Sequence, residues 1–283
     1  MKTWEARAAA YDRSFGKLCA GPIDRLLDDT GPGSLLDAGC GTGTLAARAE
    51  TRGRTVTACD AEASMIGIAR DRLRGRVIQA ALPELPMTDG AFDAVAANFV
   101  INHVGRPSDS VAELARVTRS GGLIAMTVWP APPAGGWGDF IGSIFRAADV
   151  VPIPSQNLDR SLDFERSIRG LGALAETAGC EISAATELRW VWSIRPDDLW
   201  AGVEGGIAVV GATYLAQSPA IRRAVKDLFL ERCSQATSAT GELEFPTEAA
   251  YPGQEAVSRV RLSSYMMRHG SGCRHPFNQL SRG

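Results

Sequence analysis

Histidine is scarce in this chain of 283 residues, with only 3 copies, and none of the 6 cysteines stands in a CxxC pair. A structural zinc site needs cysteine and histidine ligands at close spacing, and a disulfide framework is typical of small secreted chains. We therefore expect the cysteines to be buried, reduced thiols, and we expect no metal site.

The chain also lacks long hydrophobic runs and an excess of either charge. No segment approaches the roughly 20 apolar residues that a membrane span requires. The N-terminal segment MKTWEARAAAYDRS is polar and has no apolar core of a signal peptide. A formal net charge of -2 creates no global attraction for phosphate backbones. We expect a cytoplasmic protein that acts on a small molecule, with no membrane or nucleic-acid partner, and the sequence leaves its oligomeric state open.

In the first half, short aliphatic segments alternate with helical patterns. Strands are predicted near residues 34–38, 55–60, 76–80, 92–98 and 123–129, and helices near 44–52, 65–73 and 108–118. Such alternation is typical of a doubly wound α/β fold, in which helices cover both faces of a parallel sheet. Residues 1–30 are predicted to form a helical cap that precedes this domain.

The second half has a different pattern. Residues 130–138 are rich in proline and glycine, and an amphipathic segment follows over 140–148. Leu188, Trp190, Trp192 and Ile194 alternate with other residues and predict a half-buried strand. Helices are predicted near 168–178, 197–203 and 219–233. We expect one α/β domain over 31–255 with lid insertions at about 130–160 and 197–235, and a tail over 256–283 that shows no pattern and is a candidate for disorder.

The most informative segment is LLDAGCGTG, residues 35–43. Glycines between a strand and a helix let the backbone approach a ligand closely. A dinucleotide fingerprint requires a third glycine where this chain has Thr44, and Asp37 would repel a pyrophosphate. Asp60 ends the next strand, where a doubly wound fold places a carboxylate on ribose hydroxyls. The two acids favour a cationic amino acid joined to a nucleoside, such as S-adenosylmethionine (SAM).

This segment resembles the first motif of the class I SAM-dependent methyltransferases, in the branch of ubiquinone/menaquinone C-methyltransferases and many natural-product methyltransferases. Three further segments match that family in order: DAEASMI at 60–66, LPMTDGAFD at 85–93, and ELARV at 113–117 followed by a glycine pair at 121–122. The resemblance covers about residues 4–129. It implies a Rossmann-like, mainly parallel seven-stranded sheet with N-terminal helices and a C-terminal lid.

The resemblance also implies a SAM site. The methionine part would lie against the backbone of Ala38, Gly39 and Gly41, with Asp37 near its amino group and Asp60 on the ribose hydroxyls. The other residues implied to contact the cofactor are Ala61, Met65, Ala81 and Leu82 around the adenine, Asn98 and Phe99 facing the methyl group, and Tyr11 closing over it. Ala81 stands where many relatives have an aspartate.

The roles of two residues, Tyr11 and His103, each have an alternative interpretation. Tyr11 is as well explained by core packing as by closure over the cofactor. His103 follows the fourth predicted strand and is a candidate general base, because an imidazole titrates near neutral pH. A structural role at the start of a helix is the alternative for His103.

We expect an enzyme that transfers the methyl group of SAM to a small organic acceptor with an oxygen, nitrogen or carbon nucleophile, in a setting such as secondary metabolism. The alternative is a protein that binds SAM without methyl transfer, as a regulator or a repurposed catalyst. A nicotinamide-dependent oxidoreductase is a third hypothesis, against which Asp37 and Thr44 argue.

Overall fold

Five parallel strands form the centre of the computed structural model, which describes residues 4–130, 135–154, 158–182, 186–252 and 258–260. Their spatial order is β3 (Arg76–Gln79), β2 (Val56–Asp60), β1 (Leu35–Ala38), β4 (Phe92–Asn98) and β5 (Thr118–Thr127). The chain order therefore reverses between β1 and β4, and a doubly wound sheet binds its ligand at this point.

Two short strands continue the sheet beyond β5. β9 (Ser258–Val260) pairs antiparallel with β5, and β6 (Cys180–Glu181) pairs antiparallel with β9. The prediction of a parallel sheet is confirmed for the five central strands. The expected count of seven is reached only by adding these two short antiparallel segments.

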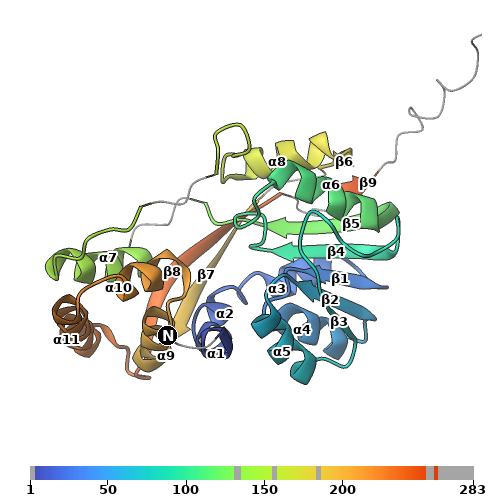
Figure 1. Cartoon of the computed structure of the whole chain (residues 1–283). Coiled ribbons are helices and arrows are strands. Elements are labelled where there is room, and N and C mark those ends of the chain that lie inside the picture. The colour runs from blue at the N-terminus through green and yellow to red at the C-terminus, as the bar shows by residue number, and fades with distance from the viewer. Residues whose placement is uncertain (1–3, 131–134, 155–157, 183–185, 253–257, 261–283) are drawn as a thin grey trace, which may run out of the picture.

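Helices cover both faces of the sheet (Figure 1). One face packs against α3 (Ile23–Asp29), α4 (Thr44–Thr51) and α5 (Ala63–Arg72), and the other against α6 (Pro107–Val117) and α8 (Ile168–Thr177). Successive strand residues point to opposite faces. In β1, Leu35 therefore packs with α3 and α4 while Leu36 packs with α6, and both side chains are fully buried.

A second hydrophobic core lies beside the sheet domain. Its elements are α2 (Phe15–Leu18), α7 (Trp137–Ala147), α9 (Pro196–Glu204), α10 (Ala208–Leu215) and α11 (Pro219–Ala236), with α1 (Trp4–Arg13) against α9. Aromatic rings fill this core: the Trp192 ring centre lies 5.8 Å from that of Phe15 and 5.9 Å from that of Phe245. Aromatic pairs at these separations contribute stability beyond their buried area.

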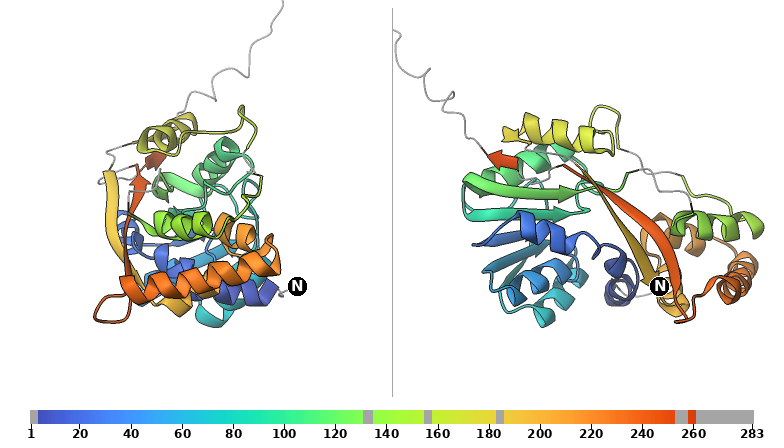
Figure 2. Two further views of the ribbon diagram at one scale, coloured as in Figure 1. Left: turned by 90° about the vertical axis from the view of Figure 1, so that its left-hand side faces the viewer. Right: turned by 180° about the vertical axis from the view of Figure 1, so that it is seen from behind.

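A long antiparallel ribbon connects the two cores. It consists of β7 (Thr186–Ile194) and β8 (Leu243–Tyr251), which pair along their full length. Figure 2 shows the ribbon crossing from the sheet to the helices around α11. At one end Tyr251 packs in the core between the sheet and α3, and at the other Phe245 packs in the second core. The ribbon therefore positions one core relative to the other.

Most of the predicted elements are found. The strand over 188–194 alternates as predicted, with Trp192 and Ile194 buried and Val191 and Ser193 exposed. The sequence did not predict α10 or β8. Most of the expected tail over 256–283 lies outside the described residues, and its described part, 258–260, is a strand. Among the described residues, no helix is both long and apolar enough to cross a membrane.

Candidate functional site

The turn after β1 requires glycine. Gly39, Gly41 and Gly43 have φ angles of +71°, +54° and +85°, a region that other residues rarely adopt. A Cβ atom at Gly39 would lie 2.4 Å from the side chain of Val100. A side chain at Gly39 would therefore clash with Val100, and Gly43 leads directly into α4.

Asp60 holds this turn from the end of β2. Its Oδ2 accepts a hydrogen bond from Gly41 N at 2.8 Å, and its Oδ1 accepts one from Glu62 N at 2.9 Å. A carboxylate oxygen can accept more than one hydrogen bond. The Asp60 carboxylate is thus oriented by two backbone groups and retains acceptor capacity for a ligand.

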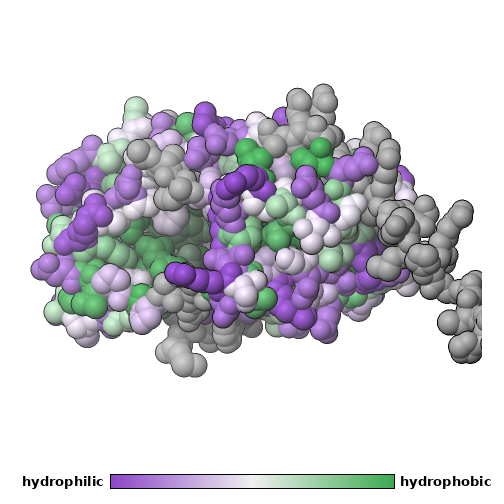
Figure 3. Space-filling view, turned by 90° about the horizontal axis from the view of Figure 1, so that it is seen from above, coloured by the Kyte–Doolittle hydropathy of each residue, from purple (hydrophilic) through white to green (hydrophobic). Residues whose placement is uncertain are grey.

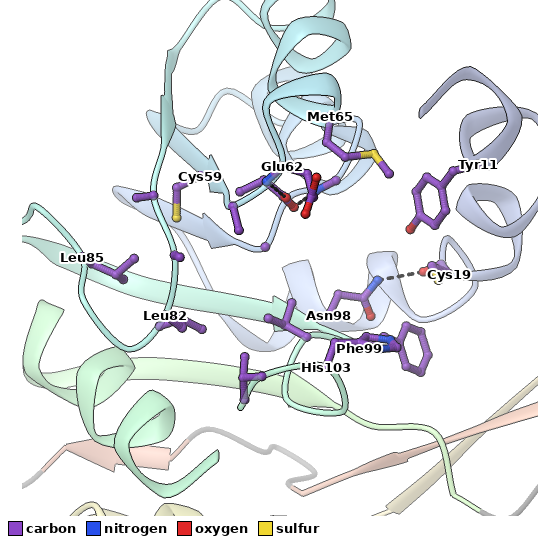
Figure 4. A pocket seen from close by; sticks show the side chains of 18 of the residues that line it. Tyr11, Cys19, Cys59, Glu62, Met65, Leu82, Leu85, Asn98, Phe99 and His103 are labelled. Carbon is purple, nitrogen blue, oxygen red and sulfur yellow. Dashed lines mark hydrogen bonds between the residues drawn. The ribbon is translucent and has the colours of Figure 1, made fainter. Parts of the chain in front are cut away.

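A cavity of about 500 Å³ opens at these turns. It brings together most of the predicted site residues: Tyr11, Gly39, Gly41, Asp60, Ala61, Met65, Ala81, Leu82, Asn98, Phe99 and His103. Figure 4 shows the side chains of Tyr11, Met65, Leu82, Asn98, Phe99 and His103 around it. Ligand sites for small molecules fall in this size range. We call it the first cavity.

The first cavity is acidic. Asp60 and Glu62 line it, and none of its described lining residues is a lysine or arginine. Such a lining favours a cationic or neutral ligand over a phosphate, because a buried anion requires a partner charge. This charge pattern speaks against a dinucleotide cofactor.

Asp37 and Ala38 do not line the first cavity. Asp37 is buried and lines a pocket of about 30 Å³ that shares Gly39 and Asn98 with it. Its Oδ2 accepts a hydrogen bond from Ala46 N at 3.0 Å. Burial raises the pKa of Asp37 to about 7, and the negative charge of Asp60 adds to the shift. Ala38 is fully buried, and its side chain belongs to the core between the sheet and α6.

Tyr11 and Cys19 bring the N-terminal helices to the site. Both line the first cavity, and the Tyr11 ring lies 3.4 Å from the position that a Cβ atom would take at Gly41. Cys19 and burial hold the pKa of Tyr11 well above its usual range, and burial raises the pKa of Cys19 to about 12. Both side chains are therefore neutral at physiological pH.

A polar network fastens helix α1 to the glycine turn. Asp12 accepts a hydrogen bond from the Thr42 hydroxyl at 2.6 Å, and Arg72 on α5 donates to both oxygens of Asp12 at 2.9 and 3.0 Å. Arg72 also donates to the Thr42 carbonyl at 3.0 Å. The network holds α1, and Tyr11 with it, over the cavity.

The end of β4 is also fixed. The Asn98 amide donates to the Cys19 carbonyl at 2.8 Å, and its oxygen accepts from the Thr127 hydroxyl at 2.7 Å. Phe99 has a φ of +58°, and its ring stacks on Trp129 with ring centres 3.6 Å apart and planes 5° apart. These contacts give the cavity a rigid wall at the switch point of the sheet.

His103 lies on the loop after β4 and lines the first cavity. Its imidazole is open to the cavity, yet the protein around it excludes enough water to lower its pKa from the usual 6.5. In the described part of the chain, no hydrogen bond or ion pair involves the His103 ring. The neutral ring is therefore available to accept a proton.

A second cavity of about 510 Å³ adjoins the first. Tyr11, Cys19, His103 and Trp129 line both, so the two cavities meet at these four residues. Figure 3 shows a hollow with hydrophobic residues on the half of the molecule that holds α7 and α10. The sequence did not predict Cys19 or Trp129 as site residues, because nothing in the local pattern brings α2 to the end of β5.

Comparison with known proteins agrees with the position of this site. Residues 36–126, which include the glycine turn, Asp60 and β4, match the family model described as "Methyltransferase domain". The malonyl-[acyl-carrier protein] O-methyltransferase of Serratia marcescens is 34% identical over 126 residues, which cover 44% of this chain and 48% of that protein.

A longer match extends into the second half. The demethylmenaquinone methyltransferase of Beutenbergia cavernae is 31% identical over 192 residues, which cover 61% of this chain and 78% of that protein. In other relatives the matched part is shorter, and the chain spans about half the length of the curated proteins that it matches first. Among solved structures, the YcgJ protein from Bacillus subtilis has a TM-score of 0.49 and 18% identity, covering 84% of this chain and 97% of that one.

Proposed function

Because this chain belongs to the SAM-dependent methyltransferases, we propose that it transfers the methyl group of SAM to a small organic acceptor with an oxygen, nitrogen or carbon nucleophile. The observation that carries the proposal is the first cavity, where a glycine turn, an oriented Asp60 carboxylate and an acidic lining meet. A cationic nucleoside fits each of these features.

The residues that line the first cavity and the small pocket beside it suit the parts of SAM. The backbone of Gly39 and Gly41, which line the first cavity, would receive the methionine part. Asp37 lies in the adjoining pocket, where an ammonium group would favour its carboxylate form. Asp60 would accept hydrogen bonds from the ribose hydroxyls. Ala61, Met65, Ala81 and Leu82 would pack around the adenine. Because Ala81 offers no side-chain acceptor, recognition of the adenine amine would use backbone groups.

When bound, SAM supplies an electrophilic methyl group and a neutral leaving group. The protein then has to orient the acceptor and exclude water, and orientation alone can account for a large part of the barrier reduction. The stacked pair of Phe99 and Trp129 and the fixed amide of Asn98 provide a rigid wall for this purpose. Tyr11 would close the cavity from the side of α1.

We assign His103 as a general base for acceptors that must lose a proton. It lies where the two cavities meet, and its lowered pKa keeps the ring neutral at physiological pH. An NMR pH titration of the imidazoles, with His103→Asn to assign the signal, should give a midpoint below 6.5 for His103. A midpoint at or above 6.5 would contradict a desolvated, neutral base.

Calorimetric titration with SAM and with S-adenosylhomocysteine (SAH) tests the proposed function. We expect micromolar binding that weakens at least tenfold, about 1.4 kcal/mol, in Asp60→Ala. Asp28→Ala is the control, because it removes an exposed acid whose ion pair with Arg52 lies outside the cavities. If neither ligand binds the wild-type protein, the proposal is wrong.

We further propose a division of the chain that follows from this function. Residues 1–30 form an N-terminal helical cap, of which α1 brings Tyr11 to the first cavity while α3 packs on the sheet, and 31–255 form the methyltransferase domain, whose sheet β9 joins from beyond that bound. The segments at about 130–160 and 197–235, which contain α7 and α9 to α11, act as its lid over the acceptor.

A further inference from the structure

The second cavity adjoins the cavity that we assign to the cofactor. Four residues line both cavities, and His103 and Trp129 are two of them. A molecule in the second cavity therefore contacts residues that also face the first. The inference about an acceptor rests on the proposed function, because a methyl acceptor must bind next to the methyl group of a bound SAM.

The lining of the second cavity is apolar and aromatic. Its side chains come from α2, α7, the start of α10, β8 and the end of β5, and they include Phe15, Leu18, Trp129, Trp137, Ile207 and Pro246. Aromatic walls of this kind favour flat, apolar ligands, since rings stack on rings and each buried apolar surface is stabilising.

The charges of the second cavity disfavour an anion. None of its described lining residues is a lysine or arginine, and Glu248 is its one acid. Glu248 pairs at 3.4 Å with Arg189, which does not line the cavity. An anionic acceptor would lose its hydration without gaining a cation, at a cost of several kcal/mol.

We propose that the second cavity binds the acceptor and that this acceptor is a neutral, largely apolar molecule built on one or a few aromatic rings. Its volume of about 510 Å³ suits a molecule of that size. An acceptor that carries a carboxylate or phosphate next to its methylated atom is excluded by the same lining.

Two probes of one size distinguish these classes: 2-naphthol, which is neutral at pH 7, and 2-naphthoate, which is an anion. We would measure their affinities by quenching of tryptophan fluorescence in the presence of SAH, since Trp129 and Trp137 line the cavity. We expect 2-naphthol to bind at least tenfold more tightly than 2-naphthoate. Glu248→Gln should improve binding of 2-naphthoate several-fold and leave 2-naphthol unchanged.

A cavity-filling variant locates the binding. Gly138 lines the cavity at the start of α7, and no described atom lies within 4 Å of a Cβ atom placed there. Gly138→Leu should weaken 2-naphthol binding at least tenfold and leave SAH affinity within twofold. The matched control is Gly142→Leu on the same helix, because a Cβ atom placed at Gly142 would meet only the end of Arg146, at 3.4 Å, and Gly142 lines neither cavity.

The outcomes separate this proposal from the proposed function. Equal affinities for the two probes would overturn the acceptor class, and unchanged 2-naphthol binding in Gly138→Leu would overturn the location. Neither result affects the test of the proposed methyltransferase function, which depends on SAH binding. Conversely, if the protein binds 2-naphthol but does not bind SAH, the cofactor assignment is wrong and the proposed function is refuted.

Discussion

At the scale of single residues, Asp37 combines a cost in stability with a proposed role in ligand binding. It is 1% exposed and accepts one backbone hydrogen bond, from Ala46. Burial raises its pKa from 3.8 to about 7, so the folded protein binds this proton more tightly than the unfolded chain does. The carboxyl therefore stabilises the fold less and less as the pH rises from about 4 to 7.

Asp37→Asn should remove this pH dependence. The amide oxygen can still accept from Ala46, and no charge remains to be buried, so the variant should gain stability over the wild type between pH 5 and 8. The gain at pH 8 should be on the order of 2–4 kcal/mol. Urea unfolding at the two pH values measures it.

The same variant should bind SAH at least tenfold more weakly, because an amide does not attract an ammonium group as a carboxylate does. Gained stability with lost affinity is typical of residues kept for function. A stability difference that is constant with pH would show that Asp37 is ionised at both pH values. Unchanged SAH affinity would place the amino group elsewhere.

At the scale of elements, the network of Asp12, Thr42 and Arg72 connects three segments that are distant in sequence. It joins α1 to the glycine turn and to α5, and the side chains of Asp12 and Arg72 are only 30% and 31% exposed. A half-buried ion pair within a hydrogen-bond network contributes more stability than an isolated surface ion pair. We infer that it holds the cap closed over the cofactor.

Arg72→Met should therefore loosen α1. We expect SAH affinity to fall about three- to tenfold, and amide hydrogens of α1 to exchange faster, because part of the energy that holds the cap is lost. Hydrogen exchange by mass spectrometry, with and without SAH, measures both effects.

Arg48→Met is the matched control for this experiment. Arg48 pairs with Asp24 on α3 and takes no part in the network at Thr42. If both variants change SAH binding equally, the effect comes from general destabilisation and the cap has no such role.

At the scale of the whole molecule, the β7–β8 ribbon connects the two hydrophobic cores, and the two cavities adjoin each other. The β7–β8 ribbon reaches the sheet through the bridge between Val128 and Ala250, and Tyr251 donates a hydrogen bond to Asp29 on α3 at 2.8 Å. The first cavity lies at the edge of the sheet, and the second lies between the end of β5 and the helices of the second core. A ligand in both would connect the two cores.

A cofactor that binds only the folded state should raise the melting temperature. At an SAH concentration 100 times its dissociation constant, the stabilisation is about 2.7 kcal/mol. This corresponds to a rise of roughly 5 °C or more for a domain of this size. Differential scanning fluorimetry with SAH should show the rise for the wild type and a smaller one for Asp60→Ala. No rise in either protein would contradict a cofactor site in the first cavity.

Local patterns were sufficient for the five parallel strands, the glycine turn and Asp60, and the resemblance to a known family implied most of the other residues of the first cavity. The strands ending at Ala38, Asp60 and Asn98 are marked by aliphatic runs, and parallel strands necessarily bring their carboxyl ends to one edge. The helix α10 and the strand β8 were not predicted. β8 contains Pro246 and acquires its strand conformation by pairing with β7, whose paired residues lie 49 to 65 positions earlier in the chain.

The sequence by itself therefore determined the doubly wound sheet, the glycine turn and the placing of Asp60 beside it, because these depend on short-range patterns and on the geometry of parallel strands. Only the tertiary structure decided what surrounds that turn. The burial of Asp37, the closeness of Tyr11 and Cys19, and the aromatic cavity between Trp129 and Trp137 all arise from contacts between distant segments. The local sequence does not predict such packing, because residues of these types occur equally often in an ordinary hydrophobic core.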